Sequence, residues 1–214
     1  RIFVWHYGTN FDHYFALNPN LNGLVKDIRF YAAHGVNGLM VQCNYQGPGG
    51  ELAELRQYLC AQLMWNPARD PMQIREEFCR GYYGKAAPDA LEFLRRMDKA
   101  SEEPAHIFAT WDPQVTVTPA FMDEAMKTLQ KAMLNADTPA VKNRIEKLML
   151  PFWYVKFMYP DKYGLSNADA AVLLEQVKRV VAANGITHVC EGDTNIQPWL
   201  VSLEARYPTS QPKR

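Results

Sequence analysis

The chain has 214 residues, of which 48% are hydrophobic and 21% charged, with 23 basic and 23 acidic side chains. Such a composition is typical of a globular chain that buries a sizeable core, and its balanced charge argues against nucleic acid or an anionic membrane surface as a partner. No apolar run approaches the roughly 20 residues that would span a bilayer.

The first predicted element is a β-strand at residues 2–7, where β-branched and aromatic residues run up to Gly8. Side chains alternate between the two faces of a strand, so Phe3, Trp5 and Tyr7 share one face. The pattern does not decide which face points inward. We expect the face that carries Trp5 and Tyr7 to point inward.

A strand–helix unit then repeats. Apolar residues at helical spacing predict a helix at residues 21–32, with Asn20 placed to cap it and Gly35 to stop it. A second strand is expected at 36–43, and a second helix after the glycine-rich turn at 47–50. Two successive units with apolar strands predict parallel strands covered by helices.

Two strands alone leave both edges of a sheet open. We therefore expect an α/β fold in which residues 1–70 form the last two βα units of a (β/α)₈ TIM-type barrel. The earlier strands would come from a missing N-terminal part of the same barrel. Residues 71–207 are predicted to form a helical C-terminal region, and residues 208–214 a disordered tail.

The helical region contains recurring start and stop signals. Thr118 and Thr138 each precede a proline, which is typical of an N-cap followed by the first helical position. Pro151 is expected to kink or interrupt its helix. The stretch around Trp111 is expected to be irregular or extended. The predicted helices cover residues 72–83, 87–102, 118–135, 138–159, 167–184 and 198–206, the fifth capped by Asn167.

The helix after the second strand ends near Pro67, which prevents its continuation. In a barrel this end lies on the bottom face, which serves stability and not chemistry. Trp65, Arg69 and Asp70 are therefore expected to be structural.

Metal and cofactor motifs are missing from the sequence. It contains no GxGxxG, GxSxG or HExxH pattern, and His6 and His13 are the only closely spaced histidines. No metal and no cofactor are therefore expected. The cysteines are expected to be free, buried thiols, with a disulfide or redox role as the alternative. They are Cys43, Cys60, Cys79 and Cys190.

The C-terminal ends of the two strands carry the candidate site, because barrel active sites form at that face. Aromatic rings cover the apolar faces of sugars, whereas amides and carboxylates bind hydroxyl groups. The alternative for an aromatic residue at a strand end is a place in the core. Catalytic residues stay unassigned, with Asp12 as the candidate carboxylate. The predicted substrate-binding residues are Trp5, Tyr7, Asn10, Asn44, Tyr45 and Gln46.

Three sequence runs resemble a family of bacterial polysaccharide-degrading proteins that is described as a domain of unknown function. They are Trp5-His6-Tyr7; the segment 18–38, with Asn18-Pro19-Asn20-Leu21, Asp27 to Tyr31 and Gly35 to Gly38; and the segment 54–84, with Glu54-Leu55, Leu63 to Pro67, Phe78 and Tyr82-Tyr83-Gly84. That family is similar in architecture to α-glucuronidases and β-hexosaminidases, with a (β/α)₈ barrel, an added N-terminal domain and a helical C-terminal region. The resemblance implies an extracellular or periplasmic protein whose main catalytic acid lies on an earlier strand.

Two functions follow as expectations. The first is the C-terminal portion of a glycoside hydrolase that acts on poly- or oligosaccharides, in which two carboxyl groups flank the scissile bond. The alternative is a non-catalytic carbohydrate-binding or scaffolding protein on a degenerate barrel. Fold analogy does not separate the two. For both candidate functions we expect carbohydrate and the rest of the barrel as partners. We expect no nucleic-acid partner and no membrane span.

Overall fold

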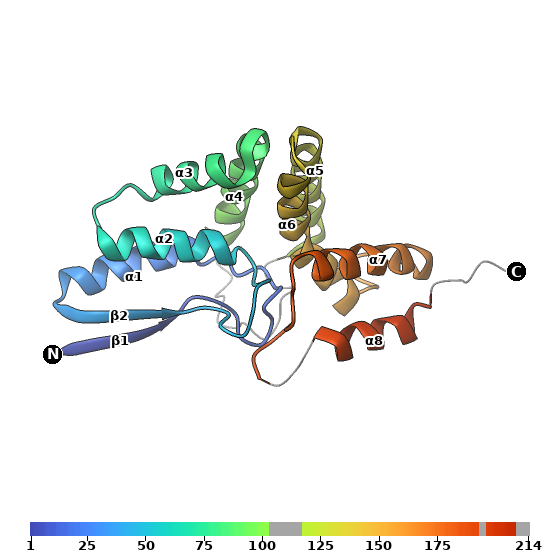
Figure 1. Cartoon of the computed structure of the whole chain (residues 1–214), viewed down its shortest axis with the longest axis horizontal. Coiled ribbons are helices and arrows are strands. Elements are labelled where there is room, and N and C mark those ends of the chain that lie inside the picture. The colour runs from blue at the N-terminus through green and yellow to red at the C-terminus, as the bar shows by residue number, and fades with distance from the viewer. Residues whose placement is uncertain (103–116, 193–195, 209–214) are drawn as a thin grey trace, which may run out of the picture.

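The computed structural model describes residues 1–102, 117–192 and 196–208 of the chain. The stretch predicted to be irregular around Trp111 and the predicted tail after residue 208 lie outside this part. The described chain is a mostly helical α/β structure. Two parallel strands with their helices come first, and a series of helices follows (Figure 1).

The first half is a β–α–β–α unit. Strand β1 (Ile2–Tyr7) pairs in parallel with β2 (Val36–Gln42), and α1 (Leu21–Ala33) and α2 (Ala53–Trp65) both lie on one side of the pair (Figure 1). The predicted strand order and direction are thus confirmed. Two strands do not close a barrel, so the (β/α)₈ architecture stays a prediction.

The two faces of the strand pair differ in their surroundings. Leu39 and Val41 of β2 pack against the helices as part of the core. On the opposite face the side chains of Phe3 and Trp5 are 72% and 62% exposed, and Met40 is also exposed. The alternation predicted from the sequence is therefore present, with the aromatic residues of β1 on the face that α1 and α2 leave open.

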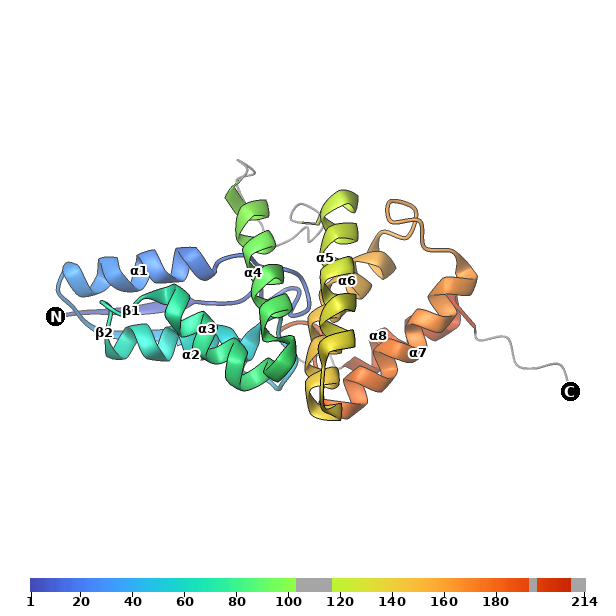
Figure 2. The same cartoon turned by 90° about the horizontal axis from the view of Figure 1, so that it is seen from above.

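The remaining helices turn away from the strands and pack on each other. Figure 2 shows α4 and α5 crossing the direction of α1 and α2, with α7 and α8 beyond the C-terminal ends of the strands. One continuous apolar core extends from α1 to α8. The bounds are α3 (Pro71–Tyr83), the short 3-10 helix η1 (Gly84–Ala86), α4 (Ala87–Glu102), α5 (Pro119–Asn135), α6 (Pro139–Met158), α7 (Asn167–Ala183) and α8 (Ile196–Arg206).

Two predicted helix starts are confirmed by the capping geometry. The hydroxyl groups of Thr118 and Thr138 accept hydrogen bonds from backbone amides at the start of α5 and α6. Ser166, not Asn167, caps α7 by accepting a bond from the Asp169 amide. Pro151 does not interrupt α6, which continues through it with the proline ring buried in the core, whereas the kink expected as the alternative stays a prediction.

The residues at the far end of α2 divide into structural and exposed ones. Asp70 caps α3, and Arg69 binds both carboxylate oxygens of Glu77 at 2.8 Å, as expected of structural residues. The expectation for Trp65 was wrong, because its side chain is 90% exposed. Its position in the last turn of α2 turns the ring away from the described core.

The four cysteines are free thiols; Cys60 and Cys79 are buried, whereas Cys43 and Cys190 are half-buried. Within residues 1–102, 117–192 and 196–208, no helix combines the length and the apolar character needed to cross a membrane. The same described residues contain no group of three or more His, Cys, Asp or Glu side chains arranged to hold a metal ion.

Candidate functional site

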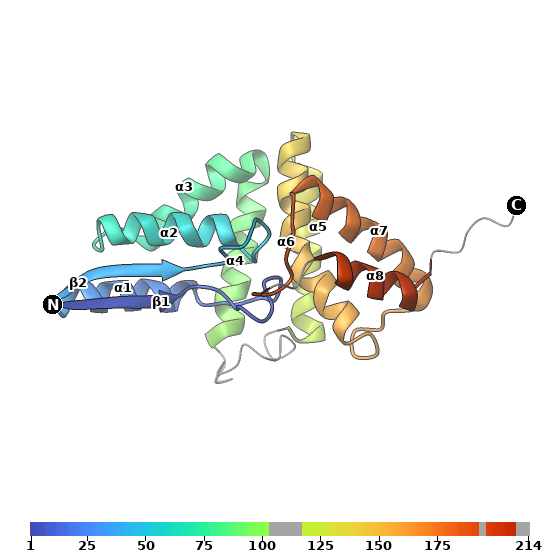
Figure 3. The same cartoon turned by 60° about the horizontal axis from the view of Figure 1, so that its bottom comes forward.

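Three loops meet at the C-terminal ends of the two strands. Two of them, residues 8–20 and 43–52, follow β1 and β2, and the third, residues 186–192, follows α7 (Figure 3). The Glu51 amide donates to the carbonyl of Tyr14 at 2.8 Å, and the Tyr14 amide donates to the carbonyl of Val189 at 2.8 Å. Backbone hydrogen bonds thus join all three loops into one surface.

Gln46 holds the third loop against the second. Its side-chain nitrogen donates to the Gly192 carbonyl at 2.6 Å, and its side-chain oxygen accepts from the Gly192 amide at 2.9 Å. Gly49 lies in the same loop as Gln46, and its φ is +110°. A Cβ atom added to Gly49 would lie only 2.7 Å from the side chain of Ile186. Only glycine combines this backbone conformation with this approach.

A buried ion pair supports the loops from beneath. The Arg56 guanidinium, 1% exposed, binds the Glu51 carboxylate at 2.5 Å and also donates to the Asn20 side chain and the Asn18 carbonyl, each at 3.2 Å. Burial raises the pKa of Glu51, and the charge of Arg56 opposes that rise. Asn20, predicted as a helix cap, instead uses its side chain to bind Arg56 and the Gly8 carbonyl.

A groove of about 630 Å³ follows the outer edge of β2. We call it the β2 groove, and it is lined by Trp5, Met40, Val41, Gln42, Cys43, Asn44, Tyr45 and Gln57. The Trp5 indole nitrogen donates to the side-chain oxygen of Gln42 at 2.7 Å. Tyr45, which follows β2, is 62% exposed. Two large aromatic rings are therefore available to a ligand in one groove.

Glu191 extends the polar part of this surface. Desolvation and, after it, the influence of the Glu191 carboxylate raise the pKa of Tyr45. Burial, and after it the negative charge of Glu191, raises the pKa of the neighbouring Tyr14 to about 12. Both phenols therefore stay neutral donors near pH 7, while Glu191 is an exposed acceptor.

The structure brings some predicted site residues together and gives others a different place. Trp5 and Tyr45 share the β2 groove, and Tyr7 lies exposed on the same face of β1, with its ring 5.3 Å from that of Phe11. Asp12 is exposed in the loop after β1. These four residues are accessible to a ligand.

The predicted amide ligands are less accessible. Asn10 is buried, and its side-chain oxygen accepts from the amides of Asp12 and His13 at 3.1 Å. Asn44 is also buried, and its side-chain nitrogen donates to the Gly47 carbonyl at 2.7 Å. These two amides and that of Gln46 shape the loops. The polar side chain that contacts an aromatic ring of the groove is instead Gln42, bonded to Trp5.

Sequence reasoning missed Gln42 and Glu191 as site residues for different reasons. Strand alternation places Gln42 on the face of Trp5, at the polar end of the strand that indicated the site, but Gln42 itself was not named as a ligand. Glu191 lies in a short loop between helices of the C-terminal region, and no local pattern predicts that this loop folds back onto the strand ends.

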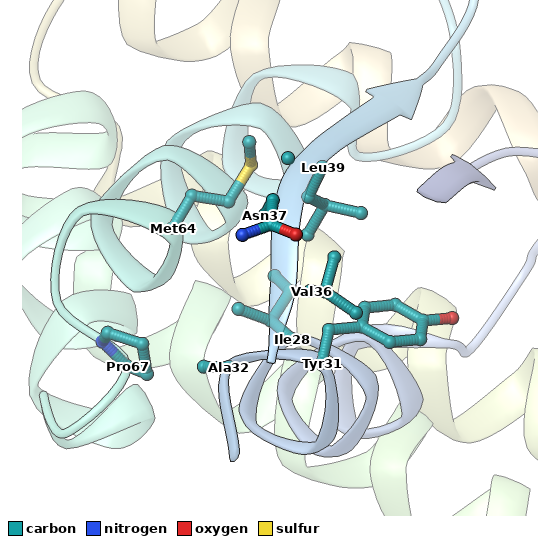
Figure 4. Close-up of a pocket in the computed structure, with 9 residues that line it drawn as sticks. Ile28, Tyr31, Ala32, Val36, Asn37, Leu39, Met64 and Pro67 are labelled. Carbon is teal, nitrogen blue, oxygen red and sulfur yellow. The ribbon is translucent and has the colours of Figure 1, made fainter. Parts of the chain in front are cut away.

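A second hollow, of about 200 Å³, lies at the opposite end of the strands between α1, β2 and the end of α2. Figure 4 shows Ile28, Leu39 and Met64 in its lining, together with the polar side chain of Asn37 and the phenol of Tyr31. Exposed aromatic rings such as Trp65 occur near this hollow as well, but the three loops joined by hydrogen bonds meet at the other end of the strands, and for this reason we place the candidate site there.

Residues 1–95 match the model of a family described as Domain of unknown function (DUF4838). The match covers both strands, α1, α2 and α3, and it ends within α4. The chain matches no curated protein and no solved structure. The expected domain of unknown function is thus confirmed over these residues, which include the β2 groove but not Glu191.

Proposed function

We propose that the chain binds poly- or oligosaccharide at the C-terminal ends of β1 and β2, through Trp5 and Tyr45, as the C-terminal portion of an extracellular or periplasmic glycoside hydrolase built on a (β/α)₈ barrel. The observation that carries the proposal is the pairing of two exposed aromatic rings, Trp5 and Tyr45, with hydrogen-bonding groups in one groove. The resemblance to glycoside-hydrolase-like proteins supports the enzymatic part.

Sugar rings need this combination of groups. Their C–H faces stack on aromatic rings, and their hydroxyl groups need donors and acceptors at the edges. Trp5 is already fixed by its bond to Gln42, so less rotamer entropy is lost when a sugar stacks on it. The Gln42 amide nitrogen takes no part in that bond and serves as a donor.

Binding is tested with the whole chain by isothermal titration against a panel of oligosaccharides. Trp5→Ala and Tyr45→Ala should each weaken binding by about 1–3 kcal/mol, the scale of a lost aromatic contact. Phe30→Ala is the control, because it removes an exposed aromatic ring on α1, outside the groove. Unchanged affinity in both groove variants would refute the proposed site.

Asp12 distinguishes a hydrolase from a binding module. In the full-length protein, Asp12→Asn should lower kcat/KM by about tenfold if the carboxylate only binds hydroxyl groups. A loss on the order of 100-fold or more would make Asp12 a catalytic acid, base or nucleophile. We favour the smaller effect, since the resemblance places the main acid on an earlier strand. Binding without any hydrolysis by the full-length protein would favour the non-catalytic alternative.

A further inference from the structure

The outer edge of β2 is open. In the part of the chain that the structure describes, the sheet consists of β1 and β2, so β2 pairs with β1 on one side and has no strand on the other. An open edge presents unpaired backbone N–H and C=O groups, and natural proteins cover such an edge or pair it with a further strand. The outer edge of β2 is thus a pairing surface that the described residues leave unused.

Helix α2 extends over this open edge. A hollow of about 490 Å³ lies between the two elements, lined by residues of β2 and α2 together with the cysteine that follows β2. The lining residues Gln57, Cys60, Ala61 and Met64 lie at helical spacing, so they form one stripe along α2. We call them the α2 stripe. A strand added beside β2 would lie in this hollow, beneath the α2 stripe.

The chemistry of the hollow suits an apolar strand. Its nine lining residues are all uncharged, and Gln57 carries the one amide among them. Ala61 and Met64 are exposed, and Trp65, which also lines the hollow, is 90% exposed. Strands of a parallel sheet that are buried on both faces are apolar along their length. The hollow therefore matches such a strand better than it matches a sugar, whose hydroxyl groups need polar partners.

The two strand–helix units of the chain indicate how a further unit would be arranged. β1 and β2 run parallel, and α1 and α2 lie on the same side of the pair (Figure 1). Connections between parallel strands are right-handed in almost all proteins, so a further unit in the same order places its strand beside β2 and its helix on the side of α2. Trp65, at the end of α2, is then in place to pack against that unit.

We infer that the outer edge of β2 and the α2 stripe form a seam at which a further βα unit of the same barrel docks, with its strand parallel to β2. The inference rests on the barrel of the proposed function and names the partner that this surface takes. Because β2 ends at Gln42, a strand that pairs along its length ends before Tyr45. The seam and the proposed sugar site at the strand ends therefore occupy different places.

The first test measures accessibility of the α2 stripe in the full-length protein. Ala61→Cys places a thiol within the seam, and Ala182→Cys, on α7, is the matched control, because both alanines are exposed in the described chain. The thiol at position 61 should react with a maleimide at least about tenfold more slowly than the thiol at position 182, since local opening must precede its reaction. Peptide mass spectrometry separates both positions from the native cysteines. Equal rates would overturn the inference.

The second test measures the stability of the full-length protein. Ala61→Arg brings a charge into the seam and should lower the Tm by roughly 5 °C or more, whereas Ala182→Arg should leave the Tm unchanged. Trp65→Ala should also lower the Tm, because the ring would lose its packing partner. Its control is Leu134→Ala, which removes an exposed side chain of α5. An unchanged Tm in both seam variants would overturn the inference.

The outcomes distinguish the seam from the sugar site. Fast labelling at position 61, with oligosaccharide binding that Trp5→Ala abolishes, would overturn the seam and leave the sugar site standing. Slow labelling without binding of any oligosaccharide would support the seam and refute the sugar site. Slow labelling that becomes fast on dilution, together with a dimer in light scattering, would assign the edge to a second copy of the chain and overturn the inference.

Discussion

The indole nitrogen of Trp5 donates a 2.7 Å hydrogen bond to the side-chain oxygen of Gln42, which lies on the neighbouring strand. In the register of the parallel pair Gln42 is the partner of Tyr7, so the bond runs diagonally across the open face. It fixes an exposed indole ring at the edge of the β2 groove. A ring that is fixed before the ligand arrives loses less entropy on binding.

Gln42→Leu removes this bond and keeps a side chain of similar size. Because Trp5 becomes free to change rotamer, sugar affinity should fall by about 0.5–1.5 kcal/mol, which is less than for Trp5→Ala. Titration with the same oligosaccharide measures the affinities of the Gln42→Leu and Trp5→Ala variants. Gln73→Leu, at an exposed position of α3, is the control. An effect of Gln42→Leu as large as that of Trp5→Ala would mean that Gln42 binds the sugar directly.

Gly49 joins the loop after β2 to the segment that carries Glu191. Gly49→Ala forces a left-handed backbone onto alanine and places a Cβ atom 2.7 Å from Ile186, so one of the two segments must shift. The variant should lose about 1–3 kcal/mol of stability and should also lower sugar affinity. Chemical denaturation and titration measure the two effects.

Gly23 is the matched position for this comparison. It lies inside α1, and a Cβ atom added there meets nothing within 4 Å. Gly23→Ala should therefore stabilise the chain by up to about 1 kcal/mol through helix propensity and leave binding unchanged. If the two variants behaved alike, Gly49 would not have the proposed docking role.

Arg56 is the charged side chain on which the two strand-end loops depend. Arg56→Met leaves the buried Glu51 carboxylate without its ion-pair partner and removes bonds to the loop around Asn18 and Asn20. Stability should fall by about 3–5 kcal/mol. Arg179→Met, which breaks an exposed pair with Glu146, should cost less than about 1 kcal/mol. Urea denaturation at pH 7 gives the free energy of unfolding of each variant. Similar losses of stability in the two variants would contradict the supporting role assigned to Arg56.

Much of the local structure could be predicted, because it depends on short-range rules. The alternation of β1, the caps at Thr118 and Thr138 and the parallel order of the strands all follow from spacing and residue type. Pro151 shows where such rules stop. The tight packing around it in the core outweighs the local cost of a proline inside a helix.

The candidate site was predicted only in part, because it depends on contacts distant in sequence. Trp5 and Tyr45 follow from their strands, but the loop after α7 joins the surface only through the bonds of Gln46 to Gly192. Asn10 and Asn44 have the right chemistry for sugar binding, yet both are buried and bind loop backbone. Trp65 shows the converse, since an aromatic residue expected to be structural is exposed.

The buried thiols make stability depend on alkaline pH. Burial raises the pKa of Cys79 from an ordinary value of 9.0 to about 12, and that of Cys60 to about 11. The folded state therefore keeps protons that the unfolded state releases. This stabilisation is fully present below about pH 9 and is lost as pH rises toward 11–12, by up to about 1.4 kcal/mol per pH unit for each group.

Cys79→Ala removes one of these thiols and tests the effect directly. Its free energy of unfolding, measured in urea from pH 8 to pH 10.5, should start lower than that of the wild type because a cavity is left. It should then decline less steeply with pH, so the two curves converge. Ile74→Val, in the same helix and equally buried, also leaves a smaller side chain but removes no titrating group. Its curve should stay parallel to that of the wild type, and a parallel curve for Cys79→Ala as well would show that the Cys79 thiol does not supply this pH dependence.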